Sequence, residues 1–180
     1  MDAKIALCFL TYGNLSKPEL WKNFINPNYN IYIHNKYKFK GEFEKYCIKD
    51  KVKTEWSHIS LVKATLKLFN EAFKNKQNEY FILLSDKCIP LYNPDTIYNN
   101  IKRIDNNLIM CFKQNEERIN NLQDKKFLTK DEFMKQHQWM CLKRETIKFL
   151  IENDFTQKFG EKFKYSDEHY FINVINIYNI

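Results

Sequence analysis

The sequence predicts an α/β fold with a mostly parallel central sheet and helices on both of its faces. Continuous apolar segments of strand length alternate with segments whose apolar residues recur at helical spacing, and strands buried on both faces have such continuous runs. The chain has only 3 glycines and 4 prolines, which argues against an all-β sandwich with many turns. Its 180 residues fit one domain.

The predicted elements alternate along the chain. Strands are expected at residues 4–11, 29–34, 52–56, 80–85, 107–112 and 138–142. Helices are expected after Ser16, over residues 57–75 and 93–104, through Ile147 and Leu150, and after Asp167. Residues 114–135 are polar and charged with scattered apolar residues, so we expect a long and partly mobile connection there. No repeat or domain boundary interrupts this order, which predicts one domain over residues 1–180.

The net charge of +7 comes from 29 Lys and Arg residues against 22 Asp and Glu residues. Such a surplus attracts anionic partners, among them nucleic acids, membrane surfaces and phosphorylated small molecules. A lysine-rich solvated surface is the simpler explanation, because no long block of like charges occurs,. The chain has no RNA-recognition signature, helix-turn-helix pattern or zinc-finger spacing, so we do not predict a nucleic acid as its partner.

The cysteines predict a reducing environment. None of the five belongs to a C-x-x-C pair, and a zinc site is not expected without paired ligands. Several lie in apolar runs, where free cysteine behaves as a small hydrophobic residue. We therefore predict reduced thiols at Cys8, Cys47, Cys88, Cys111 and Cys141,. The chain starts directly with a strand, so we expect no signal peptide, and no apolar run reaches the roughly 18 residues of a membrane span.

The best candidate for a catalytic base is Glu168. It follows Ser166 and Asp167 and precedes His169 and an apolar run, and burial raises the pKa of a carboxylate towards a useful value for a base. The alternative is structural: Ser166 or Asp167 caps a helix, and Glu168 in its first turn interacts favourably with the helix dipole. The residues by themselves leave both interpretations open.

Other candidates lie near the carboxyl ends of the predicted strands, where open α/β sheets bind their ligands. Asp86 and Lys87 follow the strand at 80–85, with a solvated turn as the alternative. Trp56 and Trp139 can stack on a sugar or a base, although a tryptophan in a strand more often belongs to the core.

Two further residues have open roles, and several motifs are missing. Arg118 can hold a phosphate or a substrate hydroxyl, or lie free at the surface, and His34 is expected to be structural rather than a metal ligand. The chain lacks an Asp-x-Asp motif, so we predict no metal site. It also lacks the phosphate loop, the dinucleotide fingerprint and the nucleophile elbow, which argues against ATPases, dinucleotide oxidoreductases and α/β-hydrolases.

Several ordered motifs of the chain resemble those of one enzyme family. They are FLT at 9–11, YIH at 32–34, EWSHISLV at 55–62, LLSDKCIPLY at 83–92, QW at 138–139 with Arg144, and YSDEHY at 165–170. Their order and spacing resemble the core-2/I-branching β-1,6-N-acetylglucosaminyltransferases, including plant members and the related peptide xylosyltransferases. The resemblance extends over nearly the whole chain, and the strings around Ser85 and Glu168 are its most specific parts.

The resemblance implies a GT-A-like fold and an inverting transfer of GlcNAc or xylose from a UDP-sugar to a hydroxyl group, without a metal or other cofactor. Glu168 matches the family's catalytic base. Asn35 and Trp56 correspond to residues that contact the uridine, and Asn35 stands where some members have an acidic residue. By this resemblance we predict donor contacts at Thr11, Asn35, Trp56, Ser85 and Asp86, and acceptor contacts at Arg118, Gln138 and Trp139.

The resemblance also indicates a difference. Family members continue beyond the segment that matches 165–170, and that extension carries the basic residues that neutralise the leaving diphosphate. This chain ends at Ile180, so we expect a single domain without that extension. We hypothesise that Arg118, Lys125 and Lys126 supply the charge instead. The alternative is a catalytically inactive protein of the same fold that binds a sugar or nucleotide, or acts in an assembly.

The predicted partners are a UDP-sugar donor and a hydroxyl acceptor on a glycan or protein, and a homo-oligomer is left open. Family members are usually anchored in the Golgi lumen and bridged by disulfides. The expected absence of an anchor and of disulfides favours a cytoplasmic location for this chain, such as that of a large DNA virus protein in its host cell.

Overall fold

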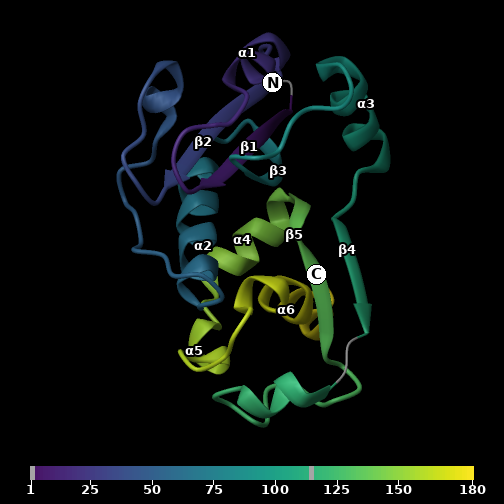
Figure 1. Ribbon diagram of the computed structural model, residues 1–180. Coiled ribbons are helices and arrows are strands. Elements are labelled where there is room, and N and C mark those ends of the chain that lie inside the picture. Colours follow the sequence, from purple (N-terminus) through teal and green to yellow (C-terminus); the bar gives the residue numbers. More distant parts are fainter. Residues whose placement is uncertain (1–2, 114–115) are drawn as a thin grey trace.

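A five-stranded sheet lies at the centre of the computed structural model, which describes residues 3–113 and 116–180 (Figure 1). Its order is β2-β1-β3-β5-β4. The strands are β1 (Lys4–Thr11), β2 (Tyr29–Asn35), β3 (Asn78–Ser85), β4 (Leu108–Lys113) and β5 (Met134–Lys143). Each has a predicted counterpart, so five of the six expected strands are confirmed.

The sheet is mixed, with a parallel core. β1 pairs in parallel with both β2 and β3. β5 runs antiparallel to β3, and β4 runs antiparallel to β5. Because β5 is antiparallel, its amino-terminal half extends past the carboxyl end of β3 and contributes residues to the same edge of the sheet.

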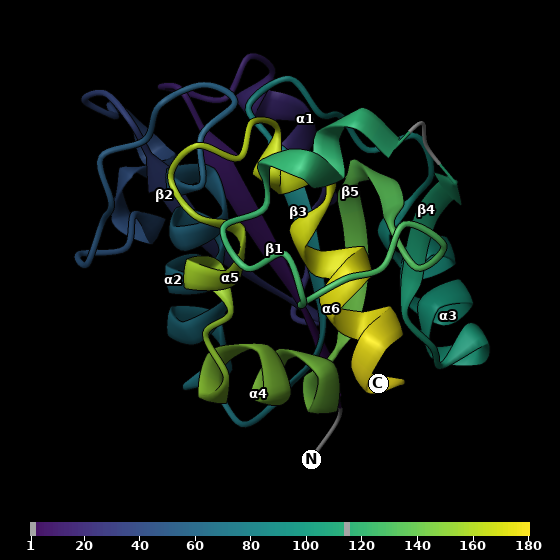
Figure 2. The same cartoon turned by 90° about the horizontal axis from the view of Figure 1, so that it is seen from below.

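Helices cover both faces, as predicted (Figures 1 and 2). One face carries α1 and α3, and the other carries α2, α4 and α6. The helices are α1 (Pro18–Phe24), α2 (Ser60–Phe73), α3 (Pro94–Ile104), α4 (Arg144–Glu152), α5 (Thr156–Phe159) and α6 (Tyr170–Tyr178). Short 3₁₀ helices are η1 (Glu42–Tyr46), η2 (Glu116–Asn121) and η3 (Ser166–Glu168).

Alternation of side chains along β1 explains the two layers. Ile5, Leu7 and Phe9 face the core under α1 and α3, whereas Ala6 and Cys8 face the core under α2 and α6. Successive strand residues point to opposite faces, so a continuous apolar strand is needed when both faces are covered. This arrangement confirms the α/β fold class.

The predicted strand at residues 52–56 is wrong. The segment is irregular in the structure, because side chains occupy its backbone donors. The Val52 amide donates to His34 Nε2 at 3.0 Å, and the Glu55 amide donates to Ser60 Oγ at 2.9 Å. A neighbouring strand cannot pair with groups already used in this way.

The long connection before β5 differs from the expected loop. Gln114, where we placed its start, lies outside the described residues. From residue 116 on the segment holds η2 and contributes Ile119, Leu122 and Phe133 to the core. Backbone hydrogen bonds tie it to α5, with the Gln123 amide donating to the Phe159 carbonyl at 3.0 Å. This part of the connection is therefore packed against the domain.

All five cysteines are free. Cys8 and Cys141 are buried, as expected for core residues, whereas Cys111 is exposed. Burial raises the pKa of the Cys141 thiol to about 12, so this thiol stays protonated. Among residues 3–113 and 116–180, no helix combines the length and the apolar character that crossing a membrane requires.

Candidate active site

Predicted site residues from four separate segments meet in one cavity at the carboxyl edge of the parallel strands. The cavity has a volume of about 190 Å³ and is lined by Thr11, Trp56, Asp86 and Gln138. Six further residues line it that we did not predict, and two of these, Lys36 and Asp167, are charged. Lys36 follows Asn35 and Asp167 precedes Glu168 in the chain. Their positions next to predicted site residues were the signal in the sequence that could have indicated them.

Thr11 and Asn35 are paired across β1 and β2. Both are buried, and Thr11 Oγ1 and Asn35 Oδ1 have no hydrogen-bond partner among the described residues. Asn35 Nδ2 donates to the Tyr37 carbonyl at 2.7 Å, which orients the amide. Buried polar atoms are rarely left unpaired, so these two oxygens are candidates to accept hydrogen bonds from a ligand; Thr11 lines the cavity, whereas Asn35 does not belong to its lining. His34 next to them is fully buried, and its Nε2 accepts a hydrogen bond from the Val52 amide, but its Nδ1 has no partner among the described residues; the expectation of a structural histidine is therefore met by one ring nitrogen only.

A β-bulge explains how Gln138 reaches the cavity. Between two paired positions, β4 advances from Ile109 to Cys111 while β5 covers the four steps from Met140 back to Gln136. Bulges of this kind re-aim side chains next to active sites. Gln138 lies within the bulge and lines the cavity, whereas its neighbour Trp139 is 42% exposed. Of the three predicted acceptor residues, Gln138 therefore lines the cavity, whereas Trp139 and Arg118 do not.

Ser85 and Asp86 also differ in their relation to the cavity, because only Asp86 lines it. Ser85 Oγ accepts a hydrogen bond from the Lys87 amide at 3.1 Å, and the Ser85 amide donates to Cys88 Sγ at 3.3 Å. The serine therefore shapes the turn after β3. Asp86 lines the cavity, and its backbone carbonyl accepts hydrogen bonds from the amide and hydroxyl of Ser16.

Glu168 lies in η3, before α6 begins at Tyr170. No side-chain cap is described for that helix, and Ser166 Oγ donates to the Phe163 carbonyl at 2.7 Å instead. The capping interpretation is therefore wrong. Two cations hold one oxygen of the carboxylate: Lys135 Nζ lies 2.9 Å and Arg118 Nη1 lies 3.6 Å from Glu168 Oε2. No described contact uses Oε1, and the side chain is 31% exposed.

Arg118 connects Glu168 to the loop of Trp56. Its guanidinium stacks 4.3 Å from the centre of the Tyr165 ring, whose edge-to-face contact with Trp56 has a centroid distance of 5.4 Å. Trp56 is 78% exposed and yet has a defined neighbour. The Tyr165 amide also donates to the Ser57 carbonyl at 2.9 Å. η2 and the segment before α6 lie side by side in Figure 2.

Ser57 and Tyr165 both have left-handed backbone conformations, with φ of 63° and 57°. Such conformations are unfavourable for residues with a Cβ and concentrate at functional sites. Here the two strained residues bond directly to each other, so strain is stored where the Trp56 loop meets the Glu168 segment.

His169 positions Arg118. The imidazole is buried and stacks on Phe133 at 4.7 Å, and its Nδ1–H donates to the Met134 carbonyl at 2.9 Å. That bond leaves the Nε2 lone pair towards Arg118 Nη1, at 3.4 Å. Burial first, and then the charge of Arg118, lower the pKa of His169 to about 4. The neutral ring is therefore the state that supports the arginine.

This shift predicts a pH dependence of stability. The folded pKa of His169 is about 4 against an ordinary value of 6.5, so the unfolded chain binds more protons between these values. His169 therefore contributes stability above pH 6.5 that is lost as the pH falls towards 4. Burial raises the pKa of Asp167 from 3.8 to about 6, which has the opposite sign and offsets part of the effect.

We expect His169→Gln to be destabilised relative to the native protein by an amount that grows as the pH rises from about 4.5 to 6.5. Urea denaturation at several pH values measures this difference. Parallel stability curves for the two proteins would contradict the assignment of the neutral imidazole.

The two lysines of the predicted charge cluster have different surroundings from Arg118. Lys125 and Lys126 are exposed, and the Lys125 ammonium donates to the Asn120 carbonyl. None of the three cations belongs to the lining of the cavity, and neither does Glu168. Of the three residues, Arg118 is the one that contacts Glu168. Sequence reasoning missed Lys135, because no local pattern marks it. The residue lies at the start of β5, and the tertiary structure brings it to η3.

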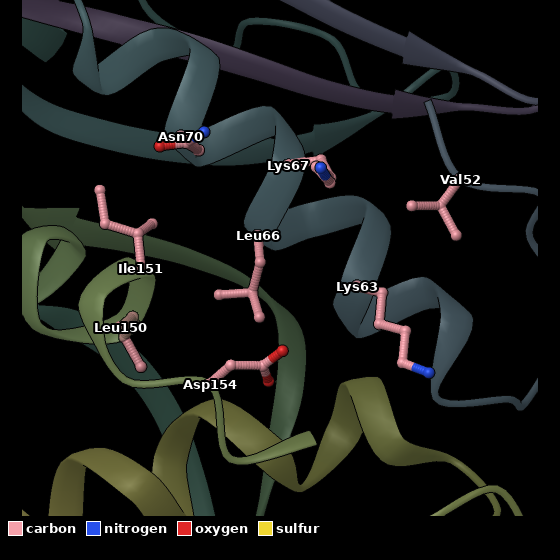
Figure 3. A pocket seen from close by; sticks show the side chains of 8 residues that line it. All are labelled: Val52, Lys63, Leu66, Lys67, Asn70, Leu150, Ile151 and Asp154. Atoms are coloured by element: carbon pink, nitrogen blue, oxygen red, sulfur yellow. The ribbon is translucent and has the colours of Figure 1, made fainter. Parts of the chain in front are cut away.

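A second groove, of about 350 Å³, lies between α2 and α4 (Figure 3). Its lysines point along the helix surface and are paired, Lys63 with Glu161 at 2.9 Å and Lys67 with Asp50 at 2.5 Å. Leu66 and Leu150 line the same groove. Its lining contains none of the predicted site residues, and the described residues of the groove do not indicate a catalytic role.

Comparison with known proteins places the chain in a family. The family model described as "Core-2/I-Branching enzyme" matches residues 5–179. The chain belongs to the core-2/I-branching enzyme family. This core-2/I-branching protein is also similar to "Glycosyltransferase BC10" of Oryza sativa subsp. japonica, with 23% identity over 165 residues, which are 85% of the chain. The match covers 41% of that relative, so the chain spans about two fifths of its length. The observed α/β sheet is consistent with a GT-A-like fold for this family.

Proposed function

We propose that this protein transfers a sugar, GlcNAc or xylose, from a UDP-sugar to a hydroxyl group with inversion and without a metal, and that Glu168 is the base. Family membership supports the class of reaction. The observation that supports the rest is the Glu168 carboxylate, which follows the cavity-lining Asp167 in the chain and whose Oε2 is held by Lys135 and Arg118. Oε1 then remains to receive a proton.

The chemical step is a single in-line displacement. The acceptor oxygen attacks the anomeric carbon while its proton passes to Glu168 Oε1. The bond between the anomeric carbon and the phosphate oxygen breaks, and UDP leaves with the electron pair. General bases of this kind contribute about 10²- to 10⁴-fold to the rate.

The donor end of the site has suitable polar groups. Thr11 Oγ1 and Asn35 Oδ1 are buried acceptors without partners among the described residues, which fits the N–H of uracil or a ribose hydroxyl. Lys36 lines the same cavity and is the cation that we assign to the diphosphate, in addition to Arg118. On the acceptor side we retain Gln138 and Trp139.

A donor screen tests the proposal. We expect the native protein to release UDP from one UDP-sugar in the presence of EDTA, and faster when a hydroxyl acceptor is added. Release that requires a divalent metal would disprove the metal-independent mechanism. UDP binding without release from any donor would favour the inactive protein of the same fold.

A further inference from the structure

The cavity contains a carboxylate, that of Asp167, that takes part in none of the ion pairs among the described residues. Asp167 lines it beside Thr11 and Trp56. Burial is the main cause that raises the pKa of Asp167, and the charge of Glu168 adds to it, although backbone N–H groups at residues 167 and 168 and the charge of Lys135 oppose the effect. Its neighbour Glu168, by contrast, has two ion pairs. A half-buried acceptor outside any described ion pair is suited to neutral hydrogen-bond donors from a ligand.

The position of Asp167 relates it to one part of the substrate. In an in-line displacement the transferred sugar lies between the nucleotide and the base. The cavity side of Thr11 and Trp56 is the proposed nucleotide end, and Glu168 is the proposed base. Asp167 adjoins Glu168 in the chain and lines the cavity with Thr11 and Trp56, so it lies where these two ends meet.

We propose that Asp167 accepts hydrogen bonds from the hydroxyl groups of the transferred sugar and thereby selects neutral sugars over uronic acids. This inference rests on the proposed function, because it takes the nucleotide and the base at the positions given above. The sugar hydroxyls donate to the carboxylate oxygens, and no covalent change occurs at Asp167.

Charge explains the selection. Asp86, whose side chain is 15% exposed and pairs with the exposed Lys87 at 3.4 Å, lines the same cavity of about 190 Å³, so a uronic acid would bring a third carboxylate close to two others. Like charges in a partly desolvated site repel each other strongly. Lys36 is the lining cation, and its Nζ lies 5.0 Å from the centre of the Tyr12 ring and 5.6 Å from that of Tyr37, at the end assigned to the diphosphate.

Calorimetry with three ligands tests the proposal without requiring turnover. UDP, the tightest-binding neutral UDP-sugar and UDP-glucuronic acid are titrated into the native protein, into Asp167→Asn and into the exposed control Asp131→Asn. We expect Asp167→Asn to weaken the neutral UDP-sugar about 10- to 100-fold, since the bond to a charged group is lost. UDP should bind as to the native protein. UDP-glucuronic acid should gain affinity, and Asp131→Asn should change none of the three values.

Each other result overturns the inference in a distinct way. An equal loss for UDP itself would assign Asp167 to the nucleotide, and unchanged sugar affinities would remove it from the donor site. If the native protein turns over a donor while Asp167→Asn binds all three ligands normally, the proposed function survives and this inference fails. If the native protein binds no UDP-sugar, both fail. Thermal unfolding of Asp167→Asn verifies its fold, which an amide in place of a desolvated carboxylate should not weaken.

Discussion

Glu168→Gln should reduce the rate of sugar transfer by about 10²- to 10⁴-fold, because the amide cannot take the acceptor's proton. The amide oxygen can still accept hydrogen bonds from Lys135 and Arg118, so the geometry around η3 should persist. We therefore expect UDP-sugar affinity to remain at its native value. Initial rates of UDP release at saturating donor and acceptor, together with calorimetric affinities, separate the two effects.

Glu161→Gln is a matched control for this variant. Glu161 is an exposed glutamate, and its ion pairs are with Lys63 and His58 rather than with site residues. Transfer should remain unchanged in this control. Native turnover in Glu168→Gln would show that another group accepts the proton, and an equal loss in both variants would indicate a general effect of lost charge.

Asn173→Leu should lower the free energy of unfolding by about 3 kcal/mol, because it removes three hydrogen bonds of a fully buried amide, each worth about 1 kcal/mol. Asn173 is fully buried. Its Oδ1 accepts from the Met134 amide at 2.8 Å, and its Nδ2 donates to the carbonyls of Met134 and His169 at 2.7 and 2.6 Å. One amide thus fastens the start of β5, which carries Lys135, to the residue after Glu168.

The corresponding fall in melting temperature is about 6–12 °C for a domain of this size. Asn176→Leu serves as the control, since Asn176 is exposed on the same helix and should change stability little. Calorimetric unfolding of both variants measures the difference. Similar melting temperatures for Asn173→Leu and the native protein would disprove the role of the amide.

The sequence alone identified most elements because their patterns are local. The continuous apolar run of β1 and the helical stripe of α2 depend on residues a few positions apart. Asn93 before Pro94 predicted the start of α3, and Asn93 Oδ1 accepts from the Thr96 amide at 2.8 Å. The segment at 52–56 failed because its amides bond to His34 and Ser60, and periodicity does not report such bonds.

The candidate site was predictable in part. Thr11, Trp56, Asp86 and Gln138 line one cavity, and a family resemblance indicated them from motifs whose mutual distances the sequence does not contain. The same family resemblance indicated Ser85 and Trp139, but neither lines the cavity. Ser85 forms hydrogen bonds within the turn after β3, and Trp139 lies beside Gln138 in the bulge of β5 without entering the lining. Side-chain direction at strand ends and bulges depends on the backbone path, which the motif does not record.

The sequence by itself determined the α/β class, the order of most elements and the family of this protein, because hydrophobic periodicity and short motifs are written in neighbouring residues. Only the tertiary structure decided that β5 runs antiparallel beside β3, that Lys135 pairs with Glu168 across 33 positions of the chain, and that Asp167 shares a cavity with Thr11. Contacts between distant residues depend on the order of the strands and on the packing of helices against both faces of the sheet. Neither is encoded in neighbouring residues.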